Sequence, residues 1–587
     1  MSELATTTPE TPVSKSAAEE KAPADEKKPD EKKPVPNGLT PRALIAGFIL
    51  SLVLCGVNSY LTLSFGVIEE GPTIAALFFF AFFFLSSTKI NSSEMAIVAT
   101  MGSAGGSLGF ITNFYAAEAM AASPYSFWQM AGFSVVTSLV GLVFVIPLRQ
   151  LLILKEKLPW PGSKAVESVI RALVEHGDPK QPYILLATCV TMIAYVVLND
   201  EDGYGLVPSG STIAIAGLGA YGAAIAWSPF AIGGAYLMGF RTCVGFLFGA
   251  TALLVLAPYL PEPGAPHHYV WPGIGFLVAA GLTQMALQGK TIVQSMKSLF
   301  ARGGTDDDDP IMPGSWFAIF TGIALVVAAV FSWFGLGLSF VITVLLIVVG
   351  GFLQNVIATR AAAQTAFNPA RVMGILLQGV TALAGGSGAA QNLAGAGFVA
   401  GSGAQAGVLT GDLAYGRWLR VPSRWQFWTQ IVTVVPCSLI SAWVFQQILA
   451  QQGGQMTIEG DGLPAPVAKM WAATALIFSG QAEMPPFAYQ AMAIGGAIGC
   501  VFVLLEQNEK LEKWLPSSTG MGLGLVLPIA YGWSFFLGGL LFVIAEKRFK
   551  VREVSLTTFA VGCIVAEGIG GVLKPLLAVL GLMPHGG

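Results

Sequence analysis

The stretch that decides the fold class spans residues 127–149 and reads FWQMAGFSVVTSLVGLVFVIPLR. Before its final arginine it holds no Asp, Glu, Lys or Arg, and it has the roughly 20 residues that a helix needs to cross a bilayer. Each unpaired backbone polar group in hydrocarbon costs several kcal/mol, so only helices and closed barrels span membranes. Barrel strands alternate apolar and polar residues over about 10 positions, which this run does not. It therefore predicts a membrane-spanning helix.

Similar apolar runs fill most of the 587 residues. The chain is 54% hydrophobic and 11% charged, against about 25% charged in an average soluble protein, and its mean hydropathy is +0.67. We expect an all-α, polytopic membrane protein with about 16 membrane segments. The segment at 73–86 is too short to span, and those at 207–240 and 516–545 are too long for one span. We expect broken or re-entrant helices at these places.

The first 39 residues differ from the rest, because they are rich in Ala, Pro, Lys and Glu and contain no apolar stretch. Such a segment cannot bury enough surface to offset its ordering entropy, which predicts a disordered tail. Lys and Arg concentrate in cytoplasmic loops. The loops at 149–180 and 290–302 are basic, whereas those at 66–72 and 116–126 have no Lys or Arg. This pattern predicts a multi-pass protein of the inner or plasma membrane with a cytoplasmic N-terminus.

An internal repeat divides the membrane part of the chain. The repeated residues keep their order, at an offset of 297 that drifts to about 308. They predict two homologous halves, 40–300 and 338–587, joined by a loop and a linking helix at 301–337. Secondary transporters commonly have this plan, with the substrate bound where the repeats meet. The recurring positions are Asn58 and Asn355, Thr62 and Thr359, Pro72 and Pro369, Trp227-Ser228 and Trp533-Ser534, and Gly233-Gly234 and Gly538-Gly539.

The relative direction of the two halves is left open by the flanking charges. Acidic residues such as Glu69 and Glu118 flank first-half segments, and arginines such as Arg371 and Arg417 flank the corresponding second-half segments. That opposition suggests an inverted repeat. The four basic residues within 547–552 fit neither arrangement.

Glycine-rich stretches follow the repeated asparagines in both halves, and they have two interpretations. Small residues four positions apart allow close helix packing. The run 385–407, however, holds eight glycines, which favours unwound backbone that meets a substrate. We expect 102–109 and 385–407 to face each other across a central cavity near mid-membrane. The predicted substrate-binding residues are Asn58, Asn355, Gln391, Asn392, Gly105, Gly106, Gly401 and Gly403.

Ionisable side chains inside spans are costly and are functional candidates by default. Glu94 begins the first glycine-rich span, and Glu567 lies in the sequence AEGIGG of the last span. Both are predicted proton-coupling residues, since a proton carrier must change charge during the cycle. The alternative for Glu94 is a helix cap, because the helix dipole favours a carboxylate at this place. A structural or interfacial ion pair is the alternative for Glu567, and it applies equally to Arg241 and Asp412.

Motifs of other chemistries lack the context that gives them meaning. GLGAYG at 217–222 matches a dinucleotide-binding pattern outside any βαβ unit. GGSLG at 105–109 matches a hydrolase elbow without an α/β sheet. The six cysteines sit singly in apolar runs, with no CxxC pair. The sequence thus predicts no cofactor, metal ion, enzyme activity or nucleic-acid partner, and an uncoupled channel, an intramembrane enzyme or a scaffold are the alternatives to a transporter.

Four stretches carry a resemblance to a known family. They are NSYLTLSFG at 58–66, LPWPGS at 158–163, GDLAYGRWLRVPSR at 411–424 and LPSSTGMGLG at 515–524. Through them the chain resembles the oligopeptide transporter family over about residues 41–550. The signatures Asn-Pro-Gly and Lys-Ile-Pro-Pro-Arg of the eukaryotic peptide branch are missing, and LPWPGS is closer to the yellow stripe-like metal–chelate branch and its prokaryotic relatives.

The resemblance implies a secondary active transporter in the lipid bilayer. It further implies a proton-coupled symporter of small-molecule substrates, either oligopeptides or peptide-like metal chelates. No individual binding residue is carried over to this chain, and a homo-oligomer is left open.

Overall fold

The computed structural model describes residues 36–66, 71–85, 89–176, 180–199, 203–213, 223–256, 270–287, 308–365, 370–386, 388–459, 463–481, 487–579 and 582. The predicted tail lies outside the described residues except for 36–39, and so does the basic loop at 290–302.

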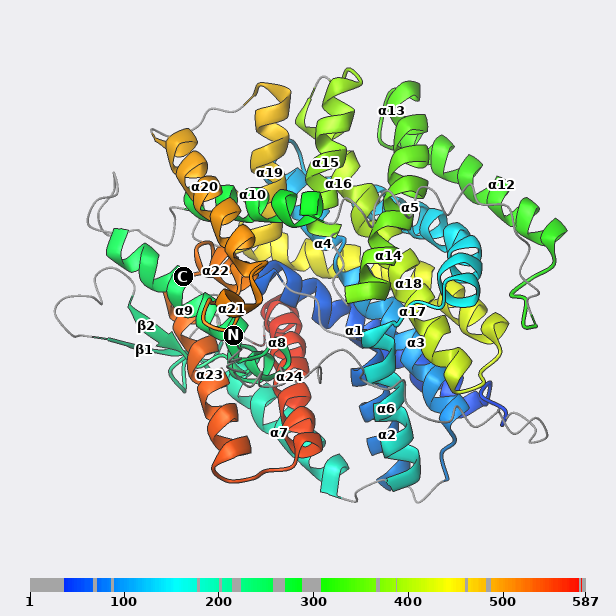
Figure 1. Cartoon of the computed structure of the whole chain (residues 1–587), viewed down its shortest axis with the longest axis horizontal. Coiled ribbons are helices and arrows are strands. Elements are labelled where there is room, and N and C mark those ends of the chain that lie inside the picture. Colours follow the sequence, from blue (N-terminus) through cyan, green and yellow to red (C-terminus); the bar gives the residue numbers. More distant parts are fainter. Residues whose placement is uncertain are drawn as a thin grey trace, which may run out of the picture. The chain divides into compact units, whose positions relative to one another are not determined.

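Helices make up nearly all of the described secondary structure (Figure 1). In the first half they are α1 (Pro41–Phe65), α2 (Gly71–Leu85), α3 (Ser92–Gly109), α4 (Thr112–Ala121), α5 (Phe127–Leu148), η1 (Arg149–Lys155), α6 (Pro161–His176), α7 (Lys180–Leu198), α8 (Pro229–Met238), α9 (Phe240–Leu256) and α10 (Trp271–Leu287). Segments marked η are π-helical. A short antiparallel hairpin of β1 (Gly210–Thr212) and β2 (Ala224–Ala226) precedes α8.

The second half begins after a linking helix, α12 (Gly314–Val330), which continues into η5 (Phe331–Gly335). The remaining elements are α13 (Phe340–Leu345), η6 (Leu346–Leu353), α14 (Gln354–Thr365), α15 (Ala370–Leu383), α16 (Ala389–Phe398), η7 (Val399–Gly403), α17 (Ala404–Trp418), α18 (Ser423–Gln451), α19 (Pro466–Ser479), α20 (Ala488–Glu506), α21 (Glu509–Glu512), α22 (Ser518–Gly524), α23 (Ile529–Lys547) and α24 (Glu553–Val579).

The predicted all-α, polytopic membrane fold is confirmed. Within the described ranges, ten helical stretches are long and apolar enough to cross a membrane, and four apolar helices are shorter. The segments of unusual length are indeed irregular. Residues 73–85 belong to the short α2. The described part of 207–240 contains the hairpin and α8, and residues 516–545 are divided between α22 and α23.

Local sequence explains where the central helices begin. Asn91 caps α3 and Ser126 caps α5, each through a reciprocal pair of side-chain and backbone hydrogen bonds with the residue three positions on. This capping box satisfies donors that the first helical turn leaves unpaired. Helix α1 begins with a Thr40 cap followed by proline, and it ends at Gly66 in the left-handed conformation that glycine adopts without strain.

Helix boundaries repeat between the halves at nearly the offset seen in the sequence. Helices α3 and α4 span 92–121, and α16, η7 and α17 span 389–418, so both ends are shifted by 297. Helix α5 with η1 spans 127–155 and α18 spans 423–451, so both ends are shifted by 296. These shared boundaries support the predicted two-repeat organisation.

Packing between helices also repeats. Helix α1 packs on α3 and α18, and its counterpart η6–α14 packs on η7, α17 and α5. Helix α4 packs on α19, and α17 packs on α6. The second glycine pair does not follow this pattern, because Gly233 packs against α24 whereas Gly538 packs against α8. The repeat is therefore clearest in the first five elements of each half.

Candidate functional site

The two glycine-rich segments are helical and cross each other in opposite directions. A Cβ placed on Gly397 would lie 2.9 Å from the ring of Phe114. Further along, Gln405 hydrogen-bonds Ser107, and Tyr415 hydrogen-bonds Thr100. Residue numbers thus rise in one segment while they fall in the other. An antiparallel crossing of these two segments is the arrangement that an inverted repeat would give.

Glycine serves close helix packing at the crossing. A side chain on Gly105 would overlap the Ser51 carbonyl of α1, and one on Gly401 would overlap the Thr137 side chain of α5. One on Gly403 would overlap the Gln354 side chain. Residues 102–109 are regular helix, whereas Gly385, Gly386 and Gly388 lie outside the helices, between α15 and α16, and the second segment departs from α-helical geometry again at η7. The structure therefore shows packed helices at 102–109 and 389–407, and non-helical backbone at the beginning of the second run.

The predicted asparagines each bridge to the glycine-rich helix of their own half. Asn58 Nδ2 donates to the Gly106 carbonyl over 3.1 Å. Asn355 Oδ1 accepts from Ser402 Oγ over 3.5 Å, and its Nδ2 donates to the Gly351 carbonyl over 2.6 Å. The two positions thus have related surroundings in the two halves, on either side of the crossing.

Gln391 and Asn392 lie apart from the other candidates, in the first turn of α16. Gln391 is half-buried, whereas Asn392 is buried with its Oδ1 3.5 Å from Thr381 Oγ1. The structure therefore does not gather the eight predicted residues into one site. It places Asn58, Gly105 and Gly106 together, Asn355, Gly401 and Gly403 together, and the α16 pair elsewhere.

A buried group of polar side chains occupies the crossing, and we call it the polar seam. Helix α3 contributes one face, α17 the opposing face and α18 a third side, and the three helices lie side by side in Figure 1. Residue Gln354 borders the seam through its contact with Gly403. The members are Thr100, Ser103 and Ser107 of α3, Gln405, Asp412 and Tyr415 of α17, Gln426 and Gln430 of α18, and Gln354 of α14.

Hydrogen bonds connect the seam across all three helices. Gln405 Nε2 donates to Ser107 Oγ over 2.8 Å, and Gln430 Nε2 donates to Gln405 Oε1 over 2.5 Å. Gln426 Nε2 lies 2.9 Å from both Thr100 Oγ1 and the Asp412 carbonyl. These bonds form two groups, one around Gln405 and one around Gln426. Polar groups inside an apolar bundle are costly to bury, and intramembrane polar residues generally mark function.

Several seam atoms lack a hydrogen-bond partner among the described residues. They are both amide atoms of Gln354, Oε1 of Gln426 and Gln430, Oγ of Ser103 and Oδ2 of Asp412. A buried unsatisfied polar group costs about 1–3 kcal/mol, and each one calls for an explanation. These atoms are the ones that other side chains leave available to bond water or a ligand. Among the described residues, no three His, Cys, Asp or Glu side chains gather as metal ligands.

Comparison with known proteins decides the class of the molecule. The family model described as OPT oligopeptide transporter protein matches residues 38–578. The chain belongs to the oligopeptide transporter family. Members of this family are transporters and not enzymes, and the chain is thus a multi-pass membrane transporter with a small-molecule, peptide-type substrate. A search among curated proteins finds no match.

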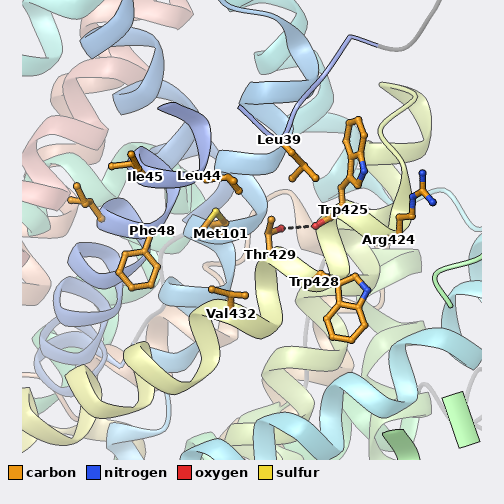
Figure 2. A pocket seen from close by; sticks show the side chains of 11 residues that line it. Leu39, Leu44, Ile45, Phe48, Met101, Arg424, Trp425, Trp428, Thr429 and Val432 are labelled. Atoms are coloured by element: carbon orange, nitrogen blue, oxygen red, sulfur yellow. Dashed lines mark hydrogen bonds between the residues drawn. The ribbon is translucent and has the colours of Figure 1, made fainter. Parts of the chain in front are cut away.

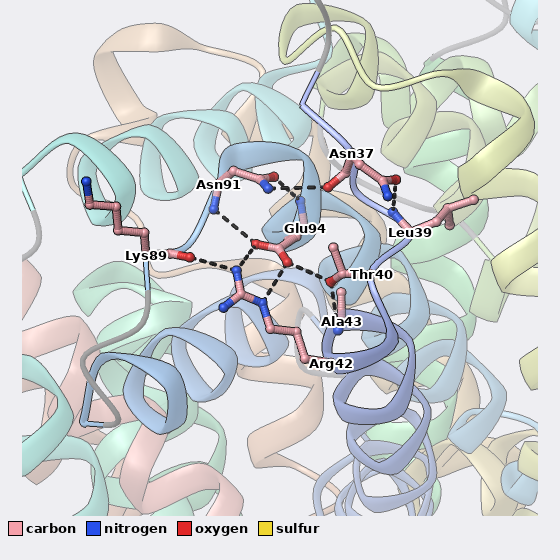
Figure 3. A network of polar contacts seen from close by, with 8 residues as sticks. All are labelled: Asn37, Leu39, Thr40, Arg42, Ala43, Lys89, Asn91 and Glu94. Carbon is pink, nitrogen blue, oxygen red and sulfur yellow. Dashed lines mark hydrogen bonds and ion pairs between the residues drawn. The ribbon is translucent and has the colours of Figure 1, made fainter.

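In this transporter, Glu94 lies in a network at the beginning of α3 (Figure 3). Its carboxylate accepts hydrogen bonds from Arg42 Nε over 2.7 Å and from Arg42 Nη2 over 2.6 Å. It also accepts from Thr40 Oγ1 and from the Asn91 backbone N–H. These contacts are those of the helix-capping alternative, and they tie α1 to α3 at one end of the bundle.

The second predicted coupling residue, Glu567, belongs to the middle of α24, and its side chain faces the first turn of α8. Its Oε2 is 3.5 Å from the backbone N–H of Phe230, in the first turn of α8. Helix N-termini stabilise negative charge through their free N–H groups and dipole. Both residues thus occupy places where a carboxylate is favoured on structural grounds.

A surface cavity of about 660 Å³ lies between α1 and α18, away from the polar seam (Figure 2). Apolar side chains such as Phe48 and Val432 form its walls, with Trp425 and Trp428 beside Arg424 at one end. Several of these side chains are exposed on the outside of the bundle. Such walls suit an apolar occupant and not a zwitterionic peptide.

Sequence reasoning missed most of the seam. It noted Asp412 as an ionisable candidate but none of the glutamines. A signal was available, because Thr100, Ser103 and Ser107 are spaced as one helical face, and so are Gln426 and Gln430. Polar stripes at helical spacing inside spans would have identified both faces.

Proposed function

We propose that this transporter is a secondary active carrier that binds its substrate at the polar seam and moves it with protons. The observation that carries the proposal is the seam itself, a buried polar path with unsatisfied amide groups where the two halves cross. In transporters built from inverted repeats, the substrate site lies at the repeat interface near mid-membrane. The seam lies where the two glycine-rich segments cross, which supports this assignment.

Amide chemistry supports a peptide-like ligand. A peptide presents alternating N–H donors and C=O acceptors, and a glutamine side chain offers both kinds of group. Gln354, Gln426 and Gln430 together present unsatisfied donor and acceptor atoms. Oligopeptides and peptide-like metal chelates share the amide, amine and carboxylate groups that such a site would bind. The seam is closed in the described conformation, so α3 and α17 must separate for a substrate to enter.

The predicted residues take supporting parts in this proposal. Asn58 and Asn355 hold neighbouring helices against the two glycine-rich segments, and the glycines let those segments approach. Gln391 and Asn392 would meet substrate near one end of the path. For coupling, Glu94 and Glu567 stay candidates by position, although both have helix N-termini as partners.

Basic residues favour a cytoplasmic N-terminus. Arg42, Lys164, Arg171 and Arg417 lie at the end of the bundle where α1 begins and α17 ends, since Arg42 bonds Glu94 and Arg171 bonds the Trp418 carbonyl. At the opposite end, the described residues 112–130, 335–345 and 448–459 contain no Lys or Arg. The positive-inside rule assigns the first end to the cytoplasm.

Uptake into proteoliposomes tests the proposal. Labelled tripeptides and ferric chelates would be offered with and without an inward proton gradient. We expect gradient-driven uptake of one class, and we expect Gln430→Leu to raise the KM at least about fivefold, since a lost hydrogen bond in a closed site costs about 1–3 kcal/mol. Gln451→Leu, at the exposed end of the same helix, is the matched control. An unchanged KM in Gln430→Leu would remove the seam as the binding site.

A further inference from the structure

Two buried carboxyl groups, Glu118 of α4 and Asp412 of α17, have no charged partner among the described residues. Their exposed fractions are 1% and 3%. Within the described part of the chain, no hydrogen bond of good geometry reaches Glu118 Oε2 or Asp412 Oδ2, although the Tyr125 hydroxyl lies beside Glu118 and the Ser103 and Tyr415 hydroxyls lie beside Asp412. An unpaired charge buried in a protein or membrane costs several kcal/mol. These acids therefore need a reason beyond packing.

The charged residues on neighbouring helices are engaged elsewhere. Helix α17 packs against α3, α5, α6, α14 and α18, and α4 packs against α1, α16, α18 and α19. Lys469 of α19 and Arg424 of α18 form no ion pair with either acid, and the titratable neighbours are phenols, Tyr125 beside Glu118 and Tyr415 beside Asp412. The other pairs are Arg42 with Glu94, Arg149 with Asp309, Arg171 with Glu167, Arg360 with Glu156, and Lys164 over the Trp418 ring.

The two acids occupy related places in the repeats. The offset of 297 that relates Asn58 to Asn355 also relates Tyr115 to Asp412 and Glu118 to Tyr415. Each half thus holds one carboxyl and one phenol, three residues apart on a helix, in opposite order. Residues that are three positions apart on a helix lie on the same side of it.

The acids also lie on opposite sides of the crossing. The hydrogen bond between Ser107 and Gln405 marks the crossing. Glu118 comes later in the chain than Ser107, and Asp412 comes later in the chain than Gln405. Because the segments are antiparallel, each acid is displaced from the crossing toward a different end of the bundle. One carboxyl therefore lies toward each end of the bundle.

We propose that Glu118 and Asp412 are the proton-binding groups of the transport cycle, each exchanging a proton with water on its own side. This inference deepens the proposed function and rests on it. In the closed conformation the neutral acid avoids the cost of an unpaired charge. When the helices part on one side, the carboxyl there meets water and releases its proton to it, so that only one O–H bond breaks and one forms. The neighbouring phenol can donate to the resulting carboxylate.

Asp412→Asn and Glu118→Gln keep the shape of the neutral acid and remove its proton exchange. In proteoliposomes both variants should lose accumulation driven by a proton gradient, and Glu118→Gln, which lies outside the polar seam, should keep substrate counterflow within about twofold of wild type. Asp412→Glu should keep some coupling, which a merely structural role would not predict. Asp308→Asn is the matched control, because Asp308 is 78% exposed and pairs with Arg417.

A second readout does not depend on transport. Infrared spectra of the purified wild-type protein at neutral pH should show the C=O band of protonated carboxyl groups, and each single variant should weaken it. Wild type without counterflow of peptides or chelates would overturn the proposed function. Normal wild-type counterflow with full proton-driven accumulation in both variants would overturn only the assignment of these two acids, whereas accumulation driven by sodium instead would overturn proton coupling as well.

Discussion

The ion pair between Arg42 and Glu94 allows a prediction in which the two single substitutions differ in cost. Glu94 has no exposed side-chain surface, whereas the Arg42 side chain is 30% exposed. Arg42→Met leaves a buried carboxylate with only the Thr40 hydroxyl and the Asn91 N–H as donors. Glu94→Gln leaves an arginine that reaches water and still donates to the Lys89 carbonyl over 2.6 Å. The arginine substitution should therefore destabilise the protein more.

The magnitudes follow from the contacts. Breaking a buried pair from one side costs about 3–5 kcal/mol, and partial exposure of Arg42 lowers our estimate to about 2–4 kcal/mol. Glutamine at the third helical position still completes a capping box, so Glu94→Gln should cost about 1–2 kcal/mol, the value of charge-assisted bonds that are lost. The double variant should cost no more than Arg42→Met alone, because the neutral glutamine removes the unpaired charge.

Equilibrium unfolding of all four proteins in mixed micelles measures this cycle. The matched control is the pair of Arg417 and Asp308, whose side chains are 44% and 78% exposed. Exposed pairs are worth about 0–1 kcal/mol, so the coupling energy of Arg417→Met with Asp308→Asn should be small. Additive costs at Arg42 and Glu94, or equal costs for the two single variants, would refute the reasoning.

Three further outcomes are expected. Gly105→Ala should lower the yield of folded protein in size-exclusion profiles, because overpacking costs about 1–3 kcal/mol, whereas Gly322→Ala, with no atom within 4 Å of its Cβ position, should match wild type. Tyr415→Phe should lower the free energy of unfolding by about 1 kcal/mol, because it removes a buried hydrogen bond to Thr100. An unchanged or higher free energy of unfolding would contradict the seam geometry. Cysteine at exposed position Gly453 should react with an impermeant maleimide added to intact cells and cysteine at Asp308 should not, and the reverse pattern would invert the proposed orientation.

Much of the architecture could be read from the sequence. Long uncharged runs such as 127–148 must be helices in a bilayer, because hydrocarbon offers no partner to backbone polar groups. The repeat was visible because equivalent places in two halves keep similar residues, such as Asn58 and Asn355. The short and long segments at 73–86 and 207–240 were recognised as irregular, since their lengths do not match the membrane thickness.

Sequence alone determined that this protein is a helical membrane bundle, made of segments whose length and hydropathy are local properties. Only the tertiary structure decided which polar residues meet. Gln405 reaches Ser107, nearly 300 positions away in the chain, because helices α3 and α17 pack side by side with these polar side chains between them. The crossing of the glycine-rich segments sets Glu118 and Asp412 apart on its two sides. Contacts of this kind depend on the packing of distant helices, for which hydropathy and spacing within one segment carry no information.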